Sequence, residues 1–274
     1  MKIHFKHLKK FFVNDIDISS LSNTLFQLGH ENEVDRNILD IEFTPNRGDC
    51  LSLNGISRDL SAIYQTNFPY KIYKDDIDEF ELDFENNDPL VLEKISFLYI
   101  EIENSQIKKY KDYLKNYFVD FDLKRNNFFT DISNYLAYET GLPTHCYDFN
   151  KINGKITFET INASNKFNTL FGNIIDLDGI NSVFKINNEI INLAGVMGGL
   201  STACEDQTKK VLIECARFQP EAIIGKTTKY GLNSDAAYKF ERGVDKDAQE
   251  FVLRRFIQII KEHTEVKEIK LFSR

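Results

Sequence analysis

The residues best suited to chemistry are polar side chains set inside apolar stretches of the chain. Glu214 stands within the run VLIECA at residues 211–216, and a carboxylate removed from water is a strong acceptor for a ligand hydroxyl. His145 lies two residues after a proline, and GLNSDAAYKFERGVD at residues 231–245 forms a third polar run. Each has a plainer alternative, because a buried glutamate is often salt-bridged and a histidine is often a hydrogen-bonded structural group. These residues are candidates for a binding or catalytic site.

Several familiar catalytic patterns are missing from the sequence. The densest glycines, GVMGG at residues 195–199, lack the lysine of a phosphate-binding loop and could be turn residues. There is no GxSxG nucleophile motif, and the five histidines show no HExxH spacing. The cysteines form no CxxC pair, so we expect reduced thiols in a cytoplasmic protein and no metal site. They are Cys50, Cys146, Cys204 and Cys215.

Length and composition place the chain among ordinary globular proteins. Its 274 residues are 42% hydrophobic and 28% charged, enough for one large domain or two smaller ones. No run of about 18 apolar residues exists, so we expect no membrane partner. The net charge of −8, from 34 basic and 42 acidic residues, argues against a broad nucleic-acid-binding face. Residues 75–88 hold eight acidic and no basic residues, which predicts a solvated acidic linker.

Hydrophobic periodicity predicts the α+β class with mixed sheets. Helices are expected where apolar residues recur every three or four positions, and strands where they alternate. The expected helices cover residues 18–28, 51–64, 110–118 and 246–262, with another beginning at Pro220. The expected strands cover residues 2–8, 39–43, 95–101, 154–160, 182–193 (a hairpin turning at Asn187-Asn188) and 265–272.

Five segments together resemble one protein family. TPNRGDCLSLNGISRDLSAIY at residues 44–64 resembles the TPNRxDCLSxxGIARE segment of bacterial phenylalanyl-tRNA synthetase β subunits. Residues 131–149, DISNYLAYETGLPTHCYDF, are similar to that family's VVDxTNYVxxExGQPxHAFD. LAGVMGG, VLIECARFQP and GLNSDAAYKFERGVD are similar to its AGVMGG, VLLExAxFxP and GLRTEASYRFERGVD, in the same order. On its sequence, the chain is identified as a member of this family.

The resemblance implies a domain layout. Residues 1–70 would be the small N-terminal α/β domain, residues 71–89 an acidic linker, and residues 90–274 the mixed α+β B3/B4 domain with the editing site. We expect the family's tRNA-binding OB domain and its C-terminal domains to be missing. The implied partners are the α subunit, in a heterotetramer, and the acceptor end of tRNA(Phe). No cofactor is expected in this chain, since ATP and Mg²⁺ would be bound through the α subunit.

The same resemblance implies how the tyrosyl group of a mischarged tRNA is held. Glu214 would accept a hydrogen bond from the tyrosine hydroxyl, and would be left unpaired if phenylalanine entered instead. Ala236 would lie beside the ring, and Ser234 keeps the hydroxyl of a family threonine. Gly195 would form the pocket wall where a side chain would obstruct the substrate.

Four further residues match positions near the tRNA end. His145 and Asn134 would act near the terminal adenosine and the scissile ester, and Ser133 replaces a threonine. Lys124 replaces an arginine, keeping the charge but losing the bidentate fork. No side chain resembles a covalent nucleophile, so direct attack by water is expected.

The implied function is that of a phenylalanine–tRNA ligase β subunit, or its editing part, which supports Phe-tRNA synthesis and hydrolyses Tyr-tRNA(Phe). A freestanding hydrolase acting on Tyr-tRNA in trans is the first alternative. A non-catalytic tRNA-binding or scaffold module is the second. We expect no aminoacylation from this chain alone.

Overall fold

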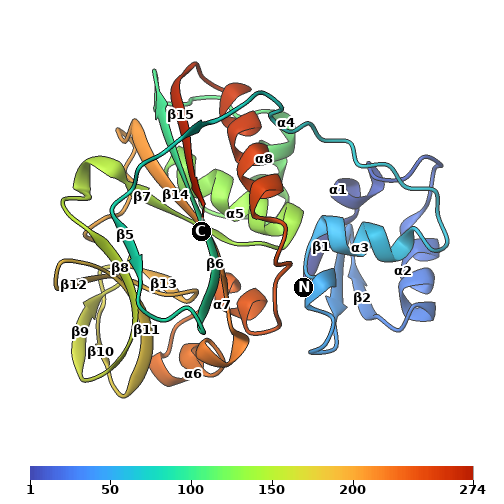
Figure 1. The fold of residues 1–274 in the computed structure, drawn as a ribbon. Helices are drawn as coiled ribbons and strands as arrows, with labels where there is room; N and C mark the ends of the chain where they lie inside the picture. Colours follow the sequence, from blue (N-terminus) through green and yellow to red (C-terminus); the bar gives the residue numbers. More distant parts are fainter. Residues whose placement is uncertain (274) are drawn as a thin grey trace.

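The N-terminal part of the chain builds a small antiparallel sheet with three helices, seen on the right of Figure 1. Its strands, in the order β1-β3-β2, are β1 (Lys2–His4), β3 (Ile38–Glu42) and β2 (Glu31–Asp35). Its helices are α1 (Phe5–Lys9), α2 (Ile18–Gln27) and α3 (Leu53–Leu60). The Asp17 and Ser52 side chains accept backbone N–H bonds at the starts of α2 and α3, as good N-caps do. The computed structural model describes residues 1–273.

The expected strand at residues 2–8 is wrong beyond its first half. The strand ends at His4, whose ring accepts a hydrogen bond from the Lys6 N–H and so begins α1. Strand β2 was not predicted, because ENEVD is charged and mostly exposed and carries no alternation to detect. It is positioned by pairing with β3 along its whole length.

The larger unit contains two five-stranded sheets. The central sheet has the order β4-β15-β6-β14-β7, with β4 (Asp78–Glu79), β15 (Val266–Ser273), β6 (Leu92–Ile102), β14 (Lys210–Phe218) and β7 (Thr144–Asp148). The outer sheet has the order β13-β12-β11-β8-β5, with β13 (Met197–Gly198), β12 (Glu189–Leu193), β11 (Ile180–Ile186), β8 (Ile156–Asn162) and β5 (Phe84–Asn86). Strand β14 pairs with β6 on one side and β7 on the other, which places it inside the central sheet.

The central sheet is covered on both faces. Helices α5 (Phe128–Thr140) and α8 (Gln249–Lys261) contact β7, β14 and β6, and the outer sheet covers the opposite face (Figure 1). Aromatic rings bridge the two sheets, with Phe158 stacked on Phe218 at 6.0 Å and Phe84 edge-on to Phe97 at 5.2 Å between ring centroids. Burial on both faces explains why residues 211–216 are apolar without alternation.

The remaining elements surround this sandwich. They are α4 (Asp112–Asp120), the hairpin of β9 (Asn165–Asn168) and β10 (Ile174–Leu177), α6 (Lys226–Tyr230), α7 (Asp235–Phe240), and 3-10 turns at Gly48–Cys50, Phe149–Lys151 and Pro220–Ala222. The hairpin turn at Asn187-Asn188 is confirmed, with Asn187 at φ 54°. The expected α+β class is confirmed. No helix of residues 1–273 combines the length and apolarity needed to cross a bilayer.

The predicted acidic linker is more ordered than expected. Its acidic side chains are largely exposed, but Asp78–Glu79 pairs with β15 and Phe84–Asn86 pairs with β8. Phe84 is buried against Phe97. The segment therefore adds an edge strand to each sheet.

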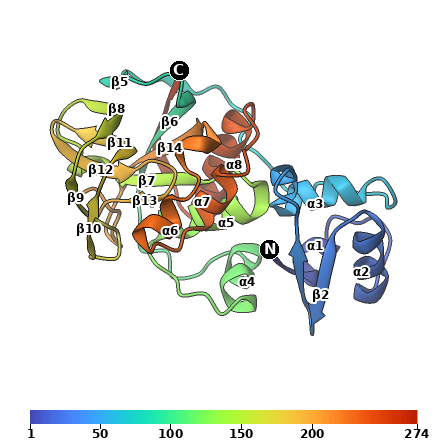
Figure 2. The same ribbon diagram turned by 90° about the horizontal axis from the view of Figure 1, so that it is seen from below.

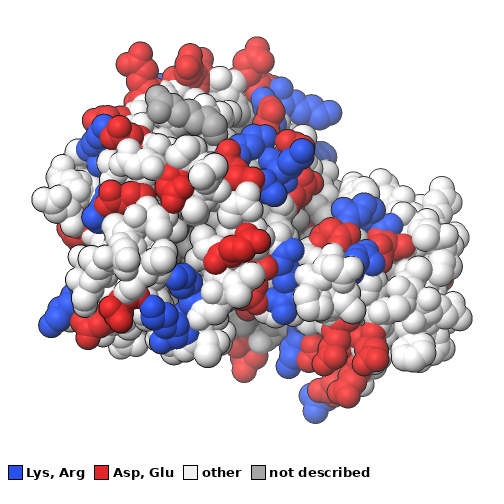
Figure 3. Space-filling view, turned by 60° about the horizontal axis from the view of Figure 1, so that its bottom comes forward, with Lys and Arg blue, Asp and Glu red and all other residues white. Residues whose placement is uncertain are grey.

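The two units meet through polar groups. His7 Nδ1 lies 3.1 Å from the Tyr138 hydroxyl and His7 Nε2 lies 3.0 Å from Asp120. Buried Lys239 donates to the backbone carbonyl of Leu51. Figures 1 and 2 both place the outer sheet on the side of the larger unit away from the smaller one. Basic and acidic side chains are interspersed over most of the face in Figure 3, with acidic groups gathered on the smaller unit.

Candidate functional site

Glu214 lies at the centre of a buried polar cluster built on three strands. The Tyr147 hydroxyl, from β7, donates to Glu214 Oε2 at 2.5 Å. The Asn192 side-chain amide, from β12, donates to the same oxygen at 3.2 Å and to the Tyr147 hydroxyl at 2.9 Å. Among residues 1–273 Glu214 forms no ion pair, so the salt-bridge alternative is wrong and its observed partners are neutral donors.

The surroundings of Glu214 favour its uncharged form. Its exposure is 5%, and that of Tyr147 and Asn192 is 0% and 3%. Burial raises the pKa of Glu214 to about 7, while the hydrogen bonds from Tyr147 and Asn192 act to lower it. Burial also raises the pKa of Tyr147 well above its ordinary value, so its hydroxyl keeps its proton. Glu214 therefore titrates near neutral pH beside a permanent phenol donor.

His145 faces the same cluster. It pairs directly with Glu214 across β7 and β14, and its ring meets the Tyr147 ring edge-on at 4.4 Å. Its Nε2 is buried with no hydrogen-bond partner among the described residues, which departs from a satisfied structural histidine. Burial lowers the pKa of His145 to about 4, so the ring is neutral at physiological pH. A Cβ at Gly198 would lie 2.1 Å from His145 Cε1, so this glycine makes room for the ring.

Gly195 and the start of α7 are linked to the cluster through the segment that follows Asn192. Gly195 has φ 69°, and a Cβ there would come within 2.8 Å of Ile223 and 3.1 Å of Phe218. The close neighbours are thus core side chains of this chain. The Ser234 hydroxyl caps α7, accepting from the Ala237 N–H at 3.1 Å and donating to the Val196 carbonyl at 2.7 Å.

The segment from Asn192 to Gly198 lies against three of the predicted site residues. Asn192 contacts Glu214, Gly198 contacts His145, and Val196 holds Ser234. Ala236 follows on α7, partly buried against the core.

The predicted residues near the tRNA end are less closely joined. The Ser133 hydroxyl donates to the Thr144 carbonyl at 2.6 Å and so ties α5 to the strand position before His145. Asn134 is exposed on α5, and Lys124 is exposed between α4 and α5. The neighbouring Arg125 lies over the Tyr110 ring at 3.6 Å. No hydrogen bond within residues 1–273 connects Asn134 or Lys124 to Glu214.

Tyr147 and Asn192 were missed by the sequence reasoning. A signal existed for Tyr147, because it lies two residues after His145 on one strand and therefore shares its face. Asn192 had no such signal, since its contact with Glu214 depends on how the two sheets pack.

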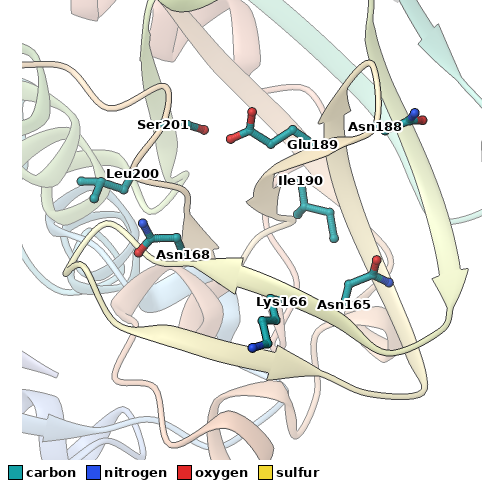
Figure 4. A pocket seen from close by; sticks show the side chains of 8 residues that line it. All are labelled: Asn165, Lys166, Asn168, Asn188, Glu189, Ile190, Leu200 and Ser201. Carbon is teal, nitrogen blue, oxygen red and sulfur yellow. The ribbon is translucent and has the colours of Figure 1, made fainter.

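A surface cavity of about 430 Å³ lies away from this cluster, beside the β9–β10 hairpin and β12 (Figure 4). Its walls are Asn165, Lys166, Asn168, Asn188, Glu189, Ile190, Leu200 and Ser201. None of these is a predicted site residue. The Glu214, Tyr147 and Asn192 side chains of the cluster are buried.

Two groups of potential metal ligands occur elsewhere. In each, the ligand atoms lie within 4.8 Å of one another: His4, His7 and Asp120 between the two units, and His30, Cys50 and Asp59 in the smaller unit. Arg47 occupies the second group, donating to the Cys50 sulfur and to Asp59 at 2.7 Å each. That group is therefore an internal ion-pair network.

The cysteines are not suited to nucleophilic catalysis. All four are free and buried. Burial raises the pKa of Cys146 and of Cys215, so both remain thiols at neutral pH.

Comparison with known proteins places the chain in a family. Residues 96–265 match the family described as B3/4 domain. The phenylalanine–tRNA ligase beta subunit of Acinetobacter baylyi is 31% identical over 234 residues, covering 84% of this chain and 29% of that protein. The corresponding subunit of Aquifex aeolicus is 31% identical over 237 residues, covering 85% and 30%. The chain thus spans under a third of these relatives' length.

Among solved structures, an N-terminal fragment of the phenylalanyl-tRNA synthetase beta subunit from Pyrococcus horikoshii matches with a TM-score of 0.46 and 11% identity. The match covers 99% of this chain and 74% of that one.

Proposed function

The chain belongs to the B3/4-domain family and is homologous to part of the phenylalanine–tRNA ligase β subunit, and from this premise we propose that it hydrolyses tyrosine wrongly esterified to tRNA(Phe). It would do so as a β subunit, or as the editing part of one. Its partner would be the α subunit, which would bind ATP, Mg²⁺ and phenylalanine for the synthesis of Phe-tRNA.

The observation that carries this proposal is the contact between Glu214 and a phenol. Inside the protein, the Glu214 carboxyl group accepts a hydrogen bond from the hydroxyl of Tyr147. The same chemistry would recognise the hydroxyl of a tyrosyl ester. A synthetic pocket rejects an added hydroxyl by only about 10²-fold, so a second site that demands the hydroxyl adds selectivity.

The hydrolytic step needs no covalent intermediate. Water adds to the ester carbonyl, the bond to the ribose oxygen breaks, and a proton passes to that oxygen, releasing tyrosine and free tRNA. His145 is neutral and its Nε2 lacks a partner, so it would position the water or the ribose. Ser133 would support it by holding the adjacent Thr144. Asn134 and Lys124 would contact the tRNA end from the exposed side of α5.

The burial of Glu214, Tyr147 and Asn192 favours a second candidate, a non-catalytic tRNA-binding module. Deacylation of purified Tyr-tRNA(Phe), with and without the α subunit, tests both. Editing is supported if the protein hydrolyses Tyr-tRNA(Phe), if His145→Ala slows that hydrolysis, and if Glu221→Ala, at an exposed position, leaves it unchanged. Activity in the absence of the α subunit would favour the freestanding hydrolase. Binding of tRNA without hydrolysis in either condition would favour the non-catalytic module.

A further inference from the structure

We propose that Tyr147 is a specificity-determining residue. It supplies a phenol hydroxyl to Glu214 from within the chain, and so weakens the discrimination of Glu214 between tyrosyl and phenylalanyl esters. This inference rests on the proposed function. It concerns which ester the site prefers, and it is tested separately from whether the site hydrolyses either one.

Glu214 receives both of its internal hydrogen bonds on the same carboxyl oxygen. Tyr147 and Asn192 both donate to Oε2, at 2.5 Å and 3.2 Å. Within residues 1–273, Oε1 accepts no hydrogen bond. One oxygen of the carboxyl group is thus satisfied internally, and the other is left for a ligand.

Hydrogen bonds and ring packing hold the Tyr147 side chain in place. Its hydroxyl accepts from Asn192 at 2.9 Å while donating to Glu214, so both of its functions are used. The ring is fully buried and packs against His145. The phenol therefore has one favoured orientation, and its proton points at Glu214.

The internal donors change the free-energy cost of binding an ester that lacks the hydroxyl. A buried carboxylate selects a hydroxyl because it is costly to leave unpaired when the hydroxyl is absent. Here two internal donors already lower that cost. A phenylalanyl ester is therefore penalised less than it would be beside a carboxylate with no internal phenol.

Removing only the Tyr147 hydroxyl should sharpen the selectivity. In Tyr147→Phe the ring and its contact with His145 remain, but Glu214 keeps Asn192 as its single internal donor. Above the Glu214 pKa of about 7 the carboxyl group is charged, and one hydrogen bond to a charged group corresponds to about a 10-fold or greater effect. At such a pH the ratio of Tyr-tRNA to Phe-tRNA hydrolysis should therefore rise by at least about 10-fold. The pKa of Glu214, followed by NMR of ¹³C-labelled glutamate, should also rise, because a hydrogen bond that lowers it is lost.

The matched control is Tyr135→Phe. Tyr135 is also buried and donates to a buried glutamate, Glu139, at 2.6 Å, but it lies on α5 within the layer behind the central sheet. This variant should leave both the ester preference and the pKa of Glu214 unchanged.

Binding of L-tyrosinamide and L-phenylalaninamide, measured by NMR, separates the inference from the proposed function. If wild type hydrolyses Tyr-tRNA and Tyr147→Phe keeps or lowers its selectivity, the inference is overturned and the function stands. If neither protein hydrolyses an ester but Tyr147→Phe gains at least about 10-fold preference for tyrosinamide, the inference stands and the function fails. If neither protein hydrolyses or binds anything, both are overturned.

Discussion

Glu214 and His145 lie directly opposite each other on neighbouring antiparallel strands, so their side chains project from the same face of the central sheet. The outer sheet covers that face, and burial moves their pKa values in opposite directions. The pKa of Glu214 rises to about 7 and that of His145 falls to about 4. Between these values both side chains are mostly uncharged.

The stability cost of Glu214 should depend on pH. Its pKa is about 7 in the folded protein against an ordinary 4.5, so its contribution favours folding below pH 4.5 and is lost as pH rises through about 7. Glu214→Gln is uncharged at every pH. At pH 8 the variant should therefore be more stable than wild type by up to about 3 kcal/mol, and the gain should shrink toward pH 4.5.

Urea unfolding of both proteins across this pH range measures the difference. The exposed Glu221→Gln serves as the control and should show no such trend. A constant difference between Glu214→Gln and wild type from pH 4.5 to 8 would contradict the assignment of a raised pKa.

A methyl group at Gly198, on the outer sheet, should displace the His145 ring from its position. The new Cβ would lie 2.1 Å from the His145 ring, so the ring must move. We expect Gly198→Ala to cost about 1–3 kcal/mol in the free energy of unfolding, as overpacking does, and to slow hydrolysis of Tyr-tRNA and Phe-tRNA alike. Wild-type hydrolysis by Gly198→Ala would contradict the placement of His145.

The buried pair of Glu139 and Arg255 should dominate the stability of the helical layer. Arg255 donates to both Glu139 oxygens, at 2.7 and 3.3 Å, and their side chains are 1% and 4% exposed. Glu139→Ala leaves a buried guanidinium unpaired and should cost about 3–5 kcal/mol in thermal or urea unfolding.

Two controls accompany this prediction. Joint replacement by Glu139→Met and Arg255→Met should recover most of the loss, because no charge stays buried. One position away on α8, Arg254 pairs with exposed Glu250 at 2.8 Å, and Glu250→Ala should cost less than about 1 kcal/mol. If Glu139→Ala and Glu250→Ala lower the free energy of unfolding equally, burial does not explain the contribution of the Glu139–Arg255 pair to stability.

Much of this fold could be predicted because its signals are local. The amphipathic pattern of residues 246–262 marked α8, and Asn187-Asn188 marked a hairpin. The buried state of Glu214 also followed from its apolar neighbours. Its contact with Tyr147 could not be predicted, since the residues are 67 positions apart and meet only when β7 pairs with β14. The edge strands in the acidic segment were missed because they are two and three residues long and hold one apolar residue, Phe84, between them.

The proposed roles of His145 and Glu214 can be tested separately, because the first concerns the ester group and the second concerns the tyrosine hydroxyl. Glu214→Ala removes an acceptor for the tyrosine hydroxyl, so the preference for Tyr-tRNA over Phe-tRNA should fall about 10–150-fold. His145→Ala removes a group near the ester itself. It should slow hydrolysis of both esters by a similar factor and leave their ratio unchanged. Ala236→Trp should block the site by volume and abolish deacylation of both esters.

Single-turnover deacylation of the two esters by wild type and the variants gives the ratio directly. Thermal unfolding of each variant separates a lost function from a lost fold. His145→Gln keeps an amide N–H donor and a carbonyl acceptor in the space of the ring. If His145→Ala changes the ratio as much as Glu214→Ala does, the two residues form one recognition unit for the amino acid side chain. The placement of His145 at the adenosine end is then wrong, and its unpartnered Nε2 belongs to the tyrosine pocket.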